Sequence, residues 1–232
     1  MKRIITFSLW NNIDRYNIGA IKNAELALQY YPDFECWFYI HKETVPEKII
    51  NQLFKMKNVK IILKEGDINI CNPMTWRFEA IDDEYVEIMM SRDTDTRILL
   101  REKLAVDEWL SSDKLFHIMR DHPHHYDKMY RINAGMFGTK KIPEIKSWKE
   151  LLLKNLNKSA NKFADQIFLN EYIYSKIINN AIVHSSFQTY KNEYTKKFPI
   201  KYCDEYKFVG EYVYEDEGRS ISHINSLKRC IR

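Results

Sequence analysis

The sequence predicts a single α/β domain: a mainly parallel β-sheet flanked by helices, with a C-terminal segment that wraps around it. The first third of the chain alternates short β-rich runs with segments of helical periodicity, the order that builds parallel sheets with helices on their faces. Its 232 residues correspond to about one and a half average domains. Hydrophobic residues make up 45 %, enough for one core, whereas 6 glycines and 6 prolines are too few for a many-turned β-sandwich.

The N-terminal elements alternate strictly between strand and helix. Three strands are expected, each a short run of β-branched and aromatic side chains: Ile4–Leu9, Cys36–Ile40 and Val59–Leu63. The helix after the first strand shows apolar residues at helical spacing over Ile18–Leu28 and stops before Pro32. A second helix begins at Pro46, because the fixed φ of proline suits a first helical turn.

The later elements follow from the same criteria. Apolar residues at helical spacing predict helices at 76–82, 98–110, 145–156 and 163–178. Short β-rich runs predict strands at 85–90, 115–119, 132–137 and 181–183. The residues of helix 98–110 expected to face the core are Leu99, Leu100, Leu104 and Trp109.

From Phe187 onward the chain is polar and aromatic with weak periodicity. A wrapping segment is therefore expected there rather than a second domain. The expected organisation is one domain over residues 1–215 and a C-terminal tail over residues 216–232.

Charge and apolar runs exclude several classes of protein. The 36 Lys and Arg and 32 Asp and Glu give a net charge of +4, with both signs spread along the chain, so no nucleic acid partner is expected. No run of about 18 apolar residues is present, so no transmembrane helix is expected. The apolar run near the N-terminus is too short for a signal peptide. The cysteines Cys36, Cys71, Cys203 and Cys230 are isolated, which favours reduced thiols and a cytoplasmic location.

Two carboxylates follow the strand expected at 85–90. Asp93 and Asp95 are one residue apart, so an extended backbone places both on the same side, about 6–7 Å apart. Ligands of open α/β sheets bind at the carboxyl ends of strands. Divalent cations such as Mg²⁺ or Mn²⁺ take oxygen ligands there and leave positions for phosphate. Arg92 and Arg97 flank the pair, and either could balance the carboxylates or contact phosphate. The alternative is an acidic turn that closes a strand.

Further motifs follow in a fixed order along the chain. They are Trp76-Arg77-Phe78, Arg120-Asp121-His122-Pro123, Asn133-Ala134-Gly135-Met136-Phe137-Gly138, Asp165-Gln166 and Phe208-Val209-Gly210-Glu211. With the first βαβ unit and the Asp-x-Asp pair, this set resembles the GT-A glycosyltransferases, in particular small transferases of bacteria and large DNA viruses. The resemblance covers residues 3–215 and implies a GT-A-like (Rossmann-like) fold.

The same resemblance implies which residues bind the donor. The loop expected at the nucleotide base consists of Ser8, Leu9, Trp10 and Asn11, with Tyr16 stacking on the base. Arg77 would reach the diphosphate or the donor sugar. Other donor contacts are expected from Arg92, Asp93, Thr94 and Gly135. As alternatives, Tyr16 is a surface aromatic residue, Arg77 pairs with Asp82 or Glu84, and Gly135 marks a β-bulge.

Metal ligation is implied for Asp93, Asp95 and His184. His184 follows the apolar run 181–183 and so stands at the end of an expected strand, and imidazole is a good ligand for Mn²⁺. The alternative is a structural histidine that only hydrogen-bonds. The denser group of His117, His122, His124 and His125 lacks the spacing of a known zinc site.

Asp121, Asp165 and Gln166 are the expected catalytic residues. A carboxylate base near the acceptor hydroxyl is needed for inversion of the sugar configuration, whereas retention in this fold relies on the leaving phosphate. Arg120 beside Asp121 makes it a poor proton acceptor, and a helix start keeps Asp165 ionised. The sequence therefore favours retention, with both aspartates binding sugar hydroxyls.

The expected reaction is metal-dependent transfer of a sugar from a nucleoside diphosphate sugar, a UDP sugar by preference, to a glycan or other hydroxyl acceptor. Mn²⁺ or Mg²⁺ would stabilise the negative charge of the leaving diphosphate. Two alternatives remain open. One is a nucleotidyltransferase, which would also hold a metal on two aspartates. The other is a protein that binds a nucleotide or a glycan without turnover.

Overall fold

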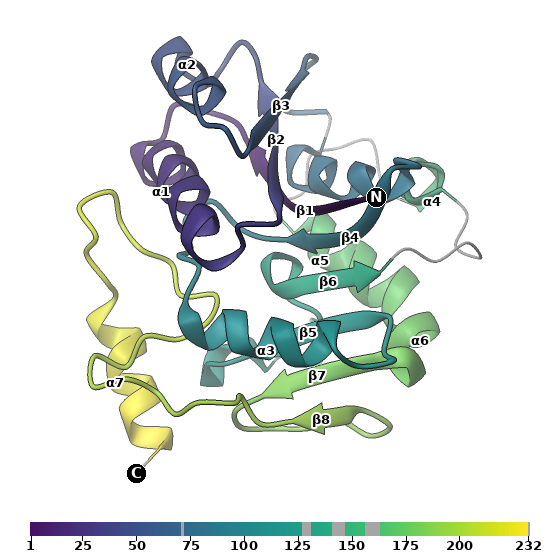
Figure 1. The fold of residues 1–232 in the computed structure, drawn as a ribbon, viewed down its shortest axis with the longest axis vertical. Coiled ribbons are helices and arrows are strands. Elements are labelled where there is room, and N and C mark those ends of the chain that lie inside the picture. The colour runs from purple at the N-terminus through teal and green to yellow at the C-terminus, as the bar shows by residue number, and fades with distance from the viewer. Residues whose placement is uncertain (71, 127–130, 141–146, 156–162, 232) are drawn as a thin grey trace.

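The computed structural model describes residues 1–70, 72–126, 131–140, 147–155 and 163–231 (Figure 1). Cys71 and both ends of the helix expected at 145–156 lie outside the described residues. No helix within the described part of the chain is long and apolar enough to cross a membrane.

One mixed sheet of eight strands forms the centre of the molecule, in the order β3-β2-β1-β4-β6-β5-β7-β8. Figure 1 shows it running from β3 at the top to β8 at the bottom. The strands are β1 (Lys2–Leu9), β2 (Glu35–His41), β3 (Val59–Lys64), β4 (Val86–Ser91), β5 (Phe116–Arg120), β6 (Phe137–Lys140), β7 (Ala181–Ser185) and β8 (Tyr194–Lys196). Only β6 is antiparallel to its neighbours, so the prediction of a mainly parallel α/β sheet is confirmed.

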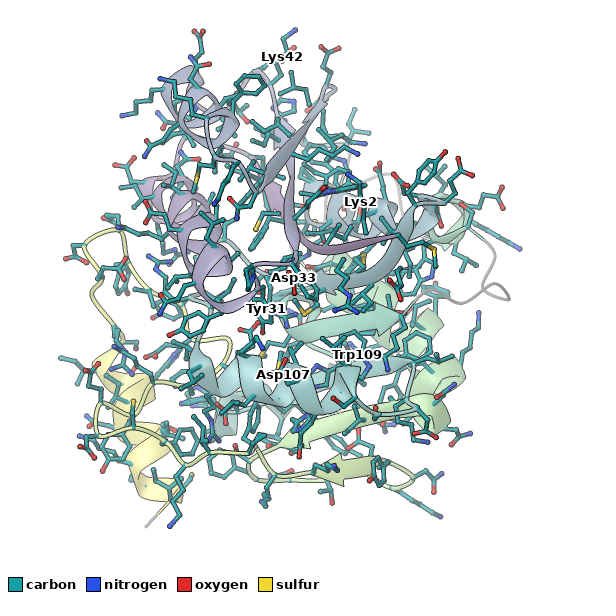
Figure 2. All side chains as sticks on the ribbon, viewed as in Figure 1. Lys2, Tyr31, Asp33, Lys42, Asp107 and Trp109 are labelled. Carbon is teal, nitrogen blue, oxygen red and sulfur yellow. The ribbon has the colours of Figure 1, made fainter. Side chains whose placement is uncertain are left out.

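Helices cover both faces of this sheet. One face carries α1 (Asp14–Tyr30), α2 (Glu47–Phe54) and α3 (Leu100–Leu110). Their core side chains include Tyr31, which directly follows α1, and Trp109 on α3, both labelled in Figure 2. The other face carries the 3₁₀ helix η1 (Pro73–Asp82), α4 (Trp148–Asn155) and a run of short helices: α5 (Ala164–Phe168), η4 (Leu169–Ile173), α6 (Tyr174–Ile177) and η5 (Ile178–Asn180). This run confirms the helix expected at 163–178, with η4 as a π-helical turn in its middle.

Two details of the sequence prediction are wrong. The strand expected at 132–137 begins only at Phe137, because Ala134–Met136 forms a 3₁₀ turn, η3, before the chain joins β4 and β5. Leu100 is 51 % exposed rather than buried, since α3 begins there and turns Ala105, Val106 and Trp109 towards the sheet.

The C-terminal segment is tied back onto the sheet. The Val213 N–H donates to the carbonyl of Asp95 (2.7 Å), and Tyr212 forms an antiparallel bridge with Thr96. Helix α7 (Ile221–Cys230) follows and packs against the 3₁₀ turn η2 (Pro123–His125), where His122 Nε2 bonds the carbonyl of His223 (3.0 Å). The segment from residue 208 onward therefore borders the loop after β4.

Candidate active site

Helix α1 fixes the loop that carries Asp93 and Asp95. A Cβ atom on Gly19 would lie 2.0 Å from the Thr94 carbonyl oxygen, so helix and loop are in direct backbone contact. The Asn23 amide donates to the carbonyls of Thr94 (3.2 Å) and Thr96 (2.8 Å), while its oxygen accepts the Ile98 N–H (3.2 Å). These three hydrogen bonds from one buried side chain hold the loop in a defined conformation.

Arg77 links two carboxylates beneath this loop. Its Nη1 donates to Asp93 (2.5 Å) and to the Arg92 carbonyl (2.9 Å), and its Nη2 donates to Asp165 (2.5 Å). Its backbone N–H donates to the Ser8 hydroxyl at the end of β1 (3.1 Å). Burial by itself would lower the pKa of Arg77, but Asp93 and Asp165 raise it above its usual value, so the guanidinium is a permanent cation. Asp93 is held in place yet keeps 44 % of its side chain exposed.

Asp95 lies deeper than Asp93 and has a weaker partner. Its Oδ2 is 3.5 Å from Nε of Arg15, and 16 % of its side chain is exposed. Burial, and then the negative charge of Asp93, raise the pKa of Asp95 to about 6. Asp93 and Asp95 thus lie close to each other with too little positive charge nearby to balance them. A divalent cation would stabilise both carboxylates in their ionised form.

Gly135 makes room for Asp93. A Cβ atom at this position would lie 1.9 Å from Oδ2 of Asp93, so only glycine fits. The sequence predicted a donor contact or a β-bulge for Gly135, and the group that lies closest to it in the structure is the Asp93 carboxylate.

Two adjoining cavities open beside these residues. The larger, of about 360 Å³, is lined by the predicted residues Arg77, Asp93, Asp95, Gly135, Asp165 and Gln166. The smaller, of about 190 Å³, is lined by the predicted residues Ser8, Asn11 and Thr94. Trp10 and Tyr16 line both cavities. The fold thus brings eleven of the predicted donor, metal and catalytic residues to one place.

A third cavity, of about 640 Å³, lies between α1 and residues 205–219 and contains neither Asp93 nor Asp95. The paired carboxylates, rather than size, identify the candidate active site.

Leu9 and Arg92 do not reach this site. Leu9 is fully buried in the core between the sheet and α1. Arg92 is buried in an ion pair with Glu102 of α3 (2.7 Å), and its Nη1 donates to the Phe137 carbonyl (3.0 Å). Arg92 therefore joins α3 to the sheet, and the expectation of a donor contact is corrected for both residues.

Asp121 also lies elsewhere. It is fully buried, and Arg101 of α3, not Arg120, is its ion-pair partner (2.8 Å). Its oxygens also accept hydrogen bonds from the Tyr202 hydroxyl (2.8 Å) and the Val209 N–H (2.9 Å). Because these donors occupy both oxygens, Asp121 fastens the C-terminal segment to β5, and the expected contact with a sugar or acceptor is corrected.

His184 is not brought to the aspartates. It lies within β7, fully buried, with Nε2 bonded to Glu108 (2.8 Å) and Nδ1 to Nε2 of His117 (2.8 Å). Since the Glu108 carboxylate only accepts, His184 donates through Nε2 and accepts through Nδ1. With both nitrogens occupied on the α3 side of the sheet, His184 is a structural histidine and its expected metal role is corrected.

Asp165 is at the site, but its environment differs from the one expected. Burial raises its pKa above the usual value, although Arg77 opposes this shift. Its Oδ2 accepts from Arg77 and its Oδ1 from the Gln166 N–H (2.8 Å).

Some residues at the site were not predicted from the sequence. Met74, His125 and Phe163 line the larger cavity, and Arg15 touches Asp95. Only Arg15 carried a usable signal, since it precedes Tyr16 on the first turns of the helix after β1. The other three lie in or beside short helical turns, η1, η2 and the start of α5, whose tertiary position the sequence does not define.

The residues present fit a hard divalent cation. The carboxylates of Asp93 and Asp95 line a cavity. The described residues contain no group of three or more His, Cys, Asp or Glu side chains suited to a metal, so an ion here would have two protein carboxylates as ligands. Magnesium and manganese sites commonly use one or two carboxylates and fill the remaining positions with water and phosphate oxygens. Asp93 and Asp95 are the residues that would hold the ion.

Comparison with known proteins supports the fold. No protein-family model and no curated protein matches the sequence. Among solved structures, the galactosyltransferase LgtC in complex with donor and acceptor sugar analogues superposes with a TM-score of 0.50 at 16 % identity, over 78 % of this chain and 73 % of that one. The chain has the GT-A glycosyltransferase fold. The expected fold resemblance is thus confirmed.

Two further solved structures superpose with lower TM-scores. A glycosyltransferase involved in glycosylation of the major capsid of PBCV-1 gives a TM-score of 0.49 at 16 % identity, over 80 % of this GT-A chain and 82 % of that one. A putative glucose-1-phosphate thymidylyltransferase from Bacillus anthracis gives a TM-score of 0.47 at 11 % identity, over 80 % of this chain and 87 % of that one. At 16 % identity the superposition on LgtC describes the fold and no activity.

Proposed function

We propose that this protein is a metal-dependent glycosyltransferase that moves a sugar from a nucleoside diphosphate sugar, a UDP sugar by preference, to a hydroxyl of a glycan or other acceptor. The observation that carries the proposal is the Asp93–Asp95 pair, which lies at the wall of a cavity and adjoins a second cavity lined by Trp10 and Tyr16. The site thus offers charged residues suited to a diphosphate next to aromatic residues suited to a nucleotide base.

Each end of the site has a chemical task. Bound Mn²⁺ or Mg²⁺ would stabilise the negative charge of the departing diphosphate as a Lewis acid. Tyr16 and Trp10 offer ring faces to the base, and Asn11, in a left-handed conformation (φ 65°), turns the chain from β1 towards α1. Arg77 holds Asp93 and Asp165 in fixed positions, so the acidic groups need no reorganisation when the donor binds.

Retention of the sugar configuration belongs to the same proposal. Asp121 is locked in the core, and Asp165 is held in an ion pair with Arg77, so neither is placed as a free base for the acceptor hydroxyl. Proton NMR of the first-formed glycoside tests this point. An anomeric configuration opposite to that of the donor would show inversion and assign Asp165 as the base.

A nucleotidyltransferase is the second candidate, because Asp165 is a third carboxylate at the same cavity. The ion pair with Arg77 occupies Asp165, which favours sugar transfer over this alternative. The products separate the two reactions: a glycosyltransferase releases UDP from a UDP sugar, whereas a nucleotidyltransferase releases pyrophosphate from a nucleoside triphosphate.

The decisive experiment measures UDP binding and donor hydrolysis with and without Mn²⁺. The wild type should bind UDP only with Mn²⁺ or Mg²⁺ and should release UDP from a UDP sugar. Asp93→Asn combined with Asp95→Asn should abolish both properties, while Asp113→Asn, at a turn after α3, should leave them unchanged. Unchanged turnover in the double variant would refute the proposal, and binding without turnover would identify a non-catalytic nucleotide-binding protein.

A further inference from the structure

Arg15 is the second cation beside the paired carboxylates. It projects from the first turn of α1, and its Nε lies 3.5 Å from Oδ2 of Asp95. Its Nη2 donates to the Tyr16 hydroxyl at 2.7 Å. Its guanidinium carbon lies 4.7 Å from the ring centre of Tyr16 and 5.5 Å from that of Tyr212 in the C-terminal segment. Two rings and one hydroxyl thus position a cation next to Asp95.

The hydrogen-bonding capacity of Arg15 is largely unused. A guanidinium carries five N–H donors. The 3.5 Å approach to Asp95 is an ion pair without a hydrogen bond, and Nε is buried with no partner among the described residues. By contrast, both Nη atoms of Arg77 donate to carboxylates or carbonyls. Nε of Arg77 is likewise buried without a partner among the described residues, but Arg15, which makes one side-chain hydrogen bond against three for Arg77, has more donors left for a ligand.

The charges of the site indicate which ligand that is. With all groups ionised, Asp93, Asp95 and Asp165 contribute three negative charges, and Arg77 and Arg15 contribute two positive ones. The net charge of minus one attracts a divalent cation and repels an anion. Once a divalent cation binds, the sign reverses to plus one, and Arg15 and the ion then both lie next to Asp95. The two positive groups, Arg15 and the ion, then repel each other. An anion with several oxygens that binds between them removes this repulsion.

We propose that Arg15 contacts the diphosphate of the donor, and that it moves from Asp95 to the phosphate oxygens when a divalent cation binds Asp95. This inference rests on the proposed function and adds to it a residue that recognises the substrate. Arginine suits this task because its planar fork donates two parallel hydrogen bonds to phosphate. Tyr16 and Tyr212 limit how far the guanidinium can move, so little side-chain entropy is lost on binding.

Two opposite effects follow for a variant that lacks this cation. In the absence of nucleotide, Arg15 and the metal compete for Asp95, so Arg15→Gln should bind Mn²⁺ several-fold more tightly than the wild type does. With Mn²⁺ saturating, the same variant should bind UDP at least about tenfold more weakly, because a charged hydrogen-bond donor to phosphate is lost. Damage to the fold would weaken both interactions, so opposite signs identify a direct role.

The experiment is a calorimetric titration with Mn²⁺ alone, then with UDP and uridine at saturating Mn²⁺. Uridine lacks the diphosphate, so its affinity should be the same in Arg15→Gln and the wild type. Arg15→Lys keeps the charge and should recover part of the UDP affinity. Lys22→Gln is the matched control: it removes a cation from the same helix, 46 % exposed and paired with Glu25, and should change none of the three affinities.

The outcomes separate this inference from the proposed function. A wild type that binds no UDP with Mn²⁺ refutes the proposed function itself. If the wild type binds UDP and Arg15→Gln binds it equally well, or loses UDP and uridine in parallel, Arg15 does not contact the diphosphate. Weaker Mn²⁺ binding in Arg15→Gln would also overturn the inference, since it would show that Arg15 supports the metal site rather than competing with the ion.

Discussion

Gly135 and Asp93 come so close that a single added carbon could not fit between them: a Cβ atom on Gly135 would lie 1.9 Å from the Asp93 carboxylate. Gly135→Ala should therefore push Asp93 out of its position against Arg77. We expect Mn²⁺ affinity to fall about tenfold or more, with loss of UDP binding, while the protein stays folded. Calorimetry measures the affinities, and circular dichroism checks the fold.

Gly138→Ala is the matched control for this variant. Its Cβ atom would meet ring atoms of Trp109 at 3.0 Å, in the core and away from Asp93. Overpacking should lower the free energy of unfolding by about 1–3 kcal/mol without changing Mn²⁺ affinity. Equal metal affinities for Gly135→Ala and the wild type would contradict the role given to Asp93.

Gly19→Ala tests the contact between α1 and the loop after β4. Alanine in a helix interior normally stabilises by about 1 kcal/mol relative to glycine. Here its Cβ would lie 2.0 Å from the Thr94 carbonyl oxygen, so the sign should reverse and the free energy of unfolding should fall. Chemical denaturation measures it, with the exposed Lys22→Ala on the same helix as the control. An increase in stability would show that α1 does not hold this loop.

Asp121→Ala distinguishes a structural from a catalytic role for this residue. Removing one partner of a buried ion pair leaves Arg101 uncompensated and should cost about 3–5 kcal/mol of unfolding free energy. At temperatures where the variant is still folded, its UDP affinity with Mn²⁺ should stay within about threefold of the wild type. An unchanged melting temperature together with lost UDP binding would instead place Asp121 at the substrate.

Acid should destabilise the protein through the histidines beside α7. Burial lowers the pKa of His122 to about 4 and that of His125 to about 3, whereas both titrate near 6.5 in the unfolded chain. Between pH 6.5 and 4 the unfolded state therefore binds more protons, and stability falls as pH falls, by up to about 1.4 kcal/mol per pH unit for each histidine.

Unfolding free energies at pH 7.5, 6.5, 5.5 and 4.5 measure this slope. The double variant His122→Gln with His125→Gln should show a shallower slope over the same range. Above pH 7 both histidines are neutral in either state, so the slopes of the two proteins should converge there. Identical slopes below pH 6.5 would show that other groups cause the acid sensitivity.

The sequence predicted those site residues whose position follows from the order of strands and helices along the chain. Asp93 and Asp95 directly follow an apolar strand, so the order of elements sufficed to place them at its carboxyl end. Tyr16, by contrast, was expected at the site only from the resemblance to GT-A glycosyltransferases. The alternation of strands and helices likewise sufficed for the parallel half of the sheet. The turn Ala134–Met136 was mistaken for strand because its apolar residues are buried in the core as those of a strand would be, Met136 together with Ala105 of α3 and Met119 of β5.

Apart from the apolar Leu9, the residues wrongly assigned to the site share one property. The partners that bury Arg92, Asp121 and His184 are Glu102, Arg101 and Glu108, all on α3. A charged or imidazole side chain at a strand end can face a ligand or a neighbouring helix, and only the register of α3 decides between the two. That register is a tertiary property, so a motif read along the chain could not reveal it.

The bonds from the C-terminal segment to the Asp93–Asp95 loop also have a consequence for biosynthesis. Arg97 pairs with Glu217, which lies 120 positions later in the chain, and Val213 binds the Asp95 carbonyl. At about 5–20 residues per second, a ribosome needs roughly 6–24 s to synthesise the chain between Arg97 and Glu217. During that interval the nascent sheet already carries both carboxylates on a loop without its final support. Under the proposed function, nucleotide binding should therefore begin only after residues 213–217 have left the exit tunnel.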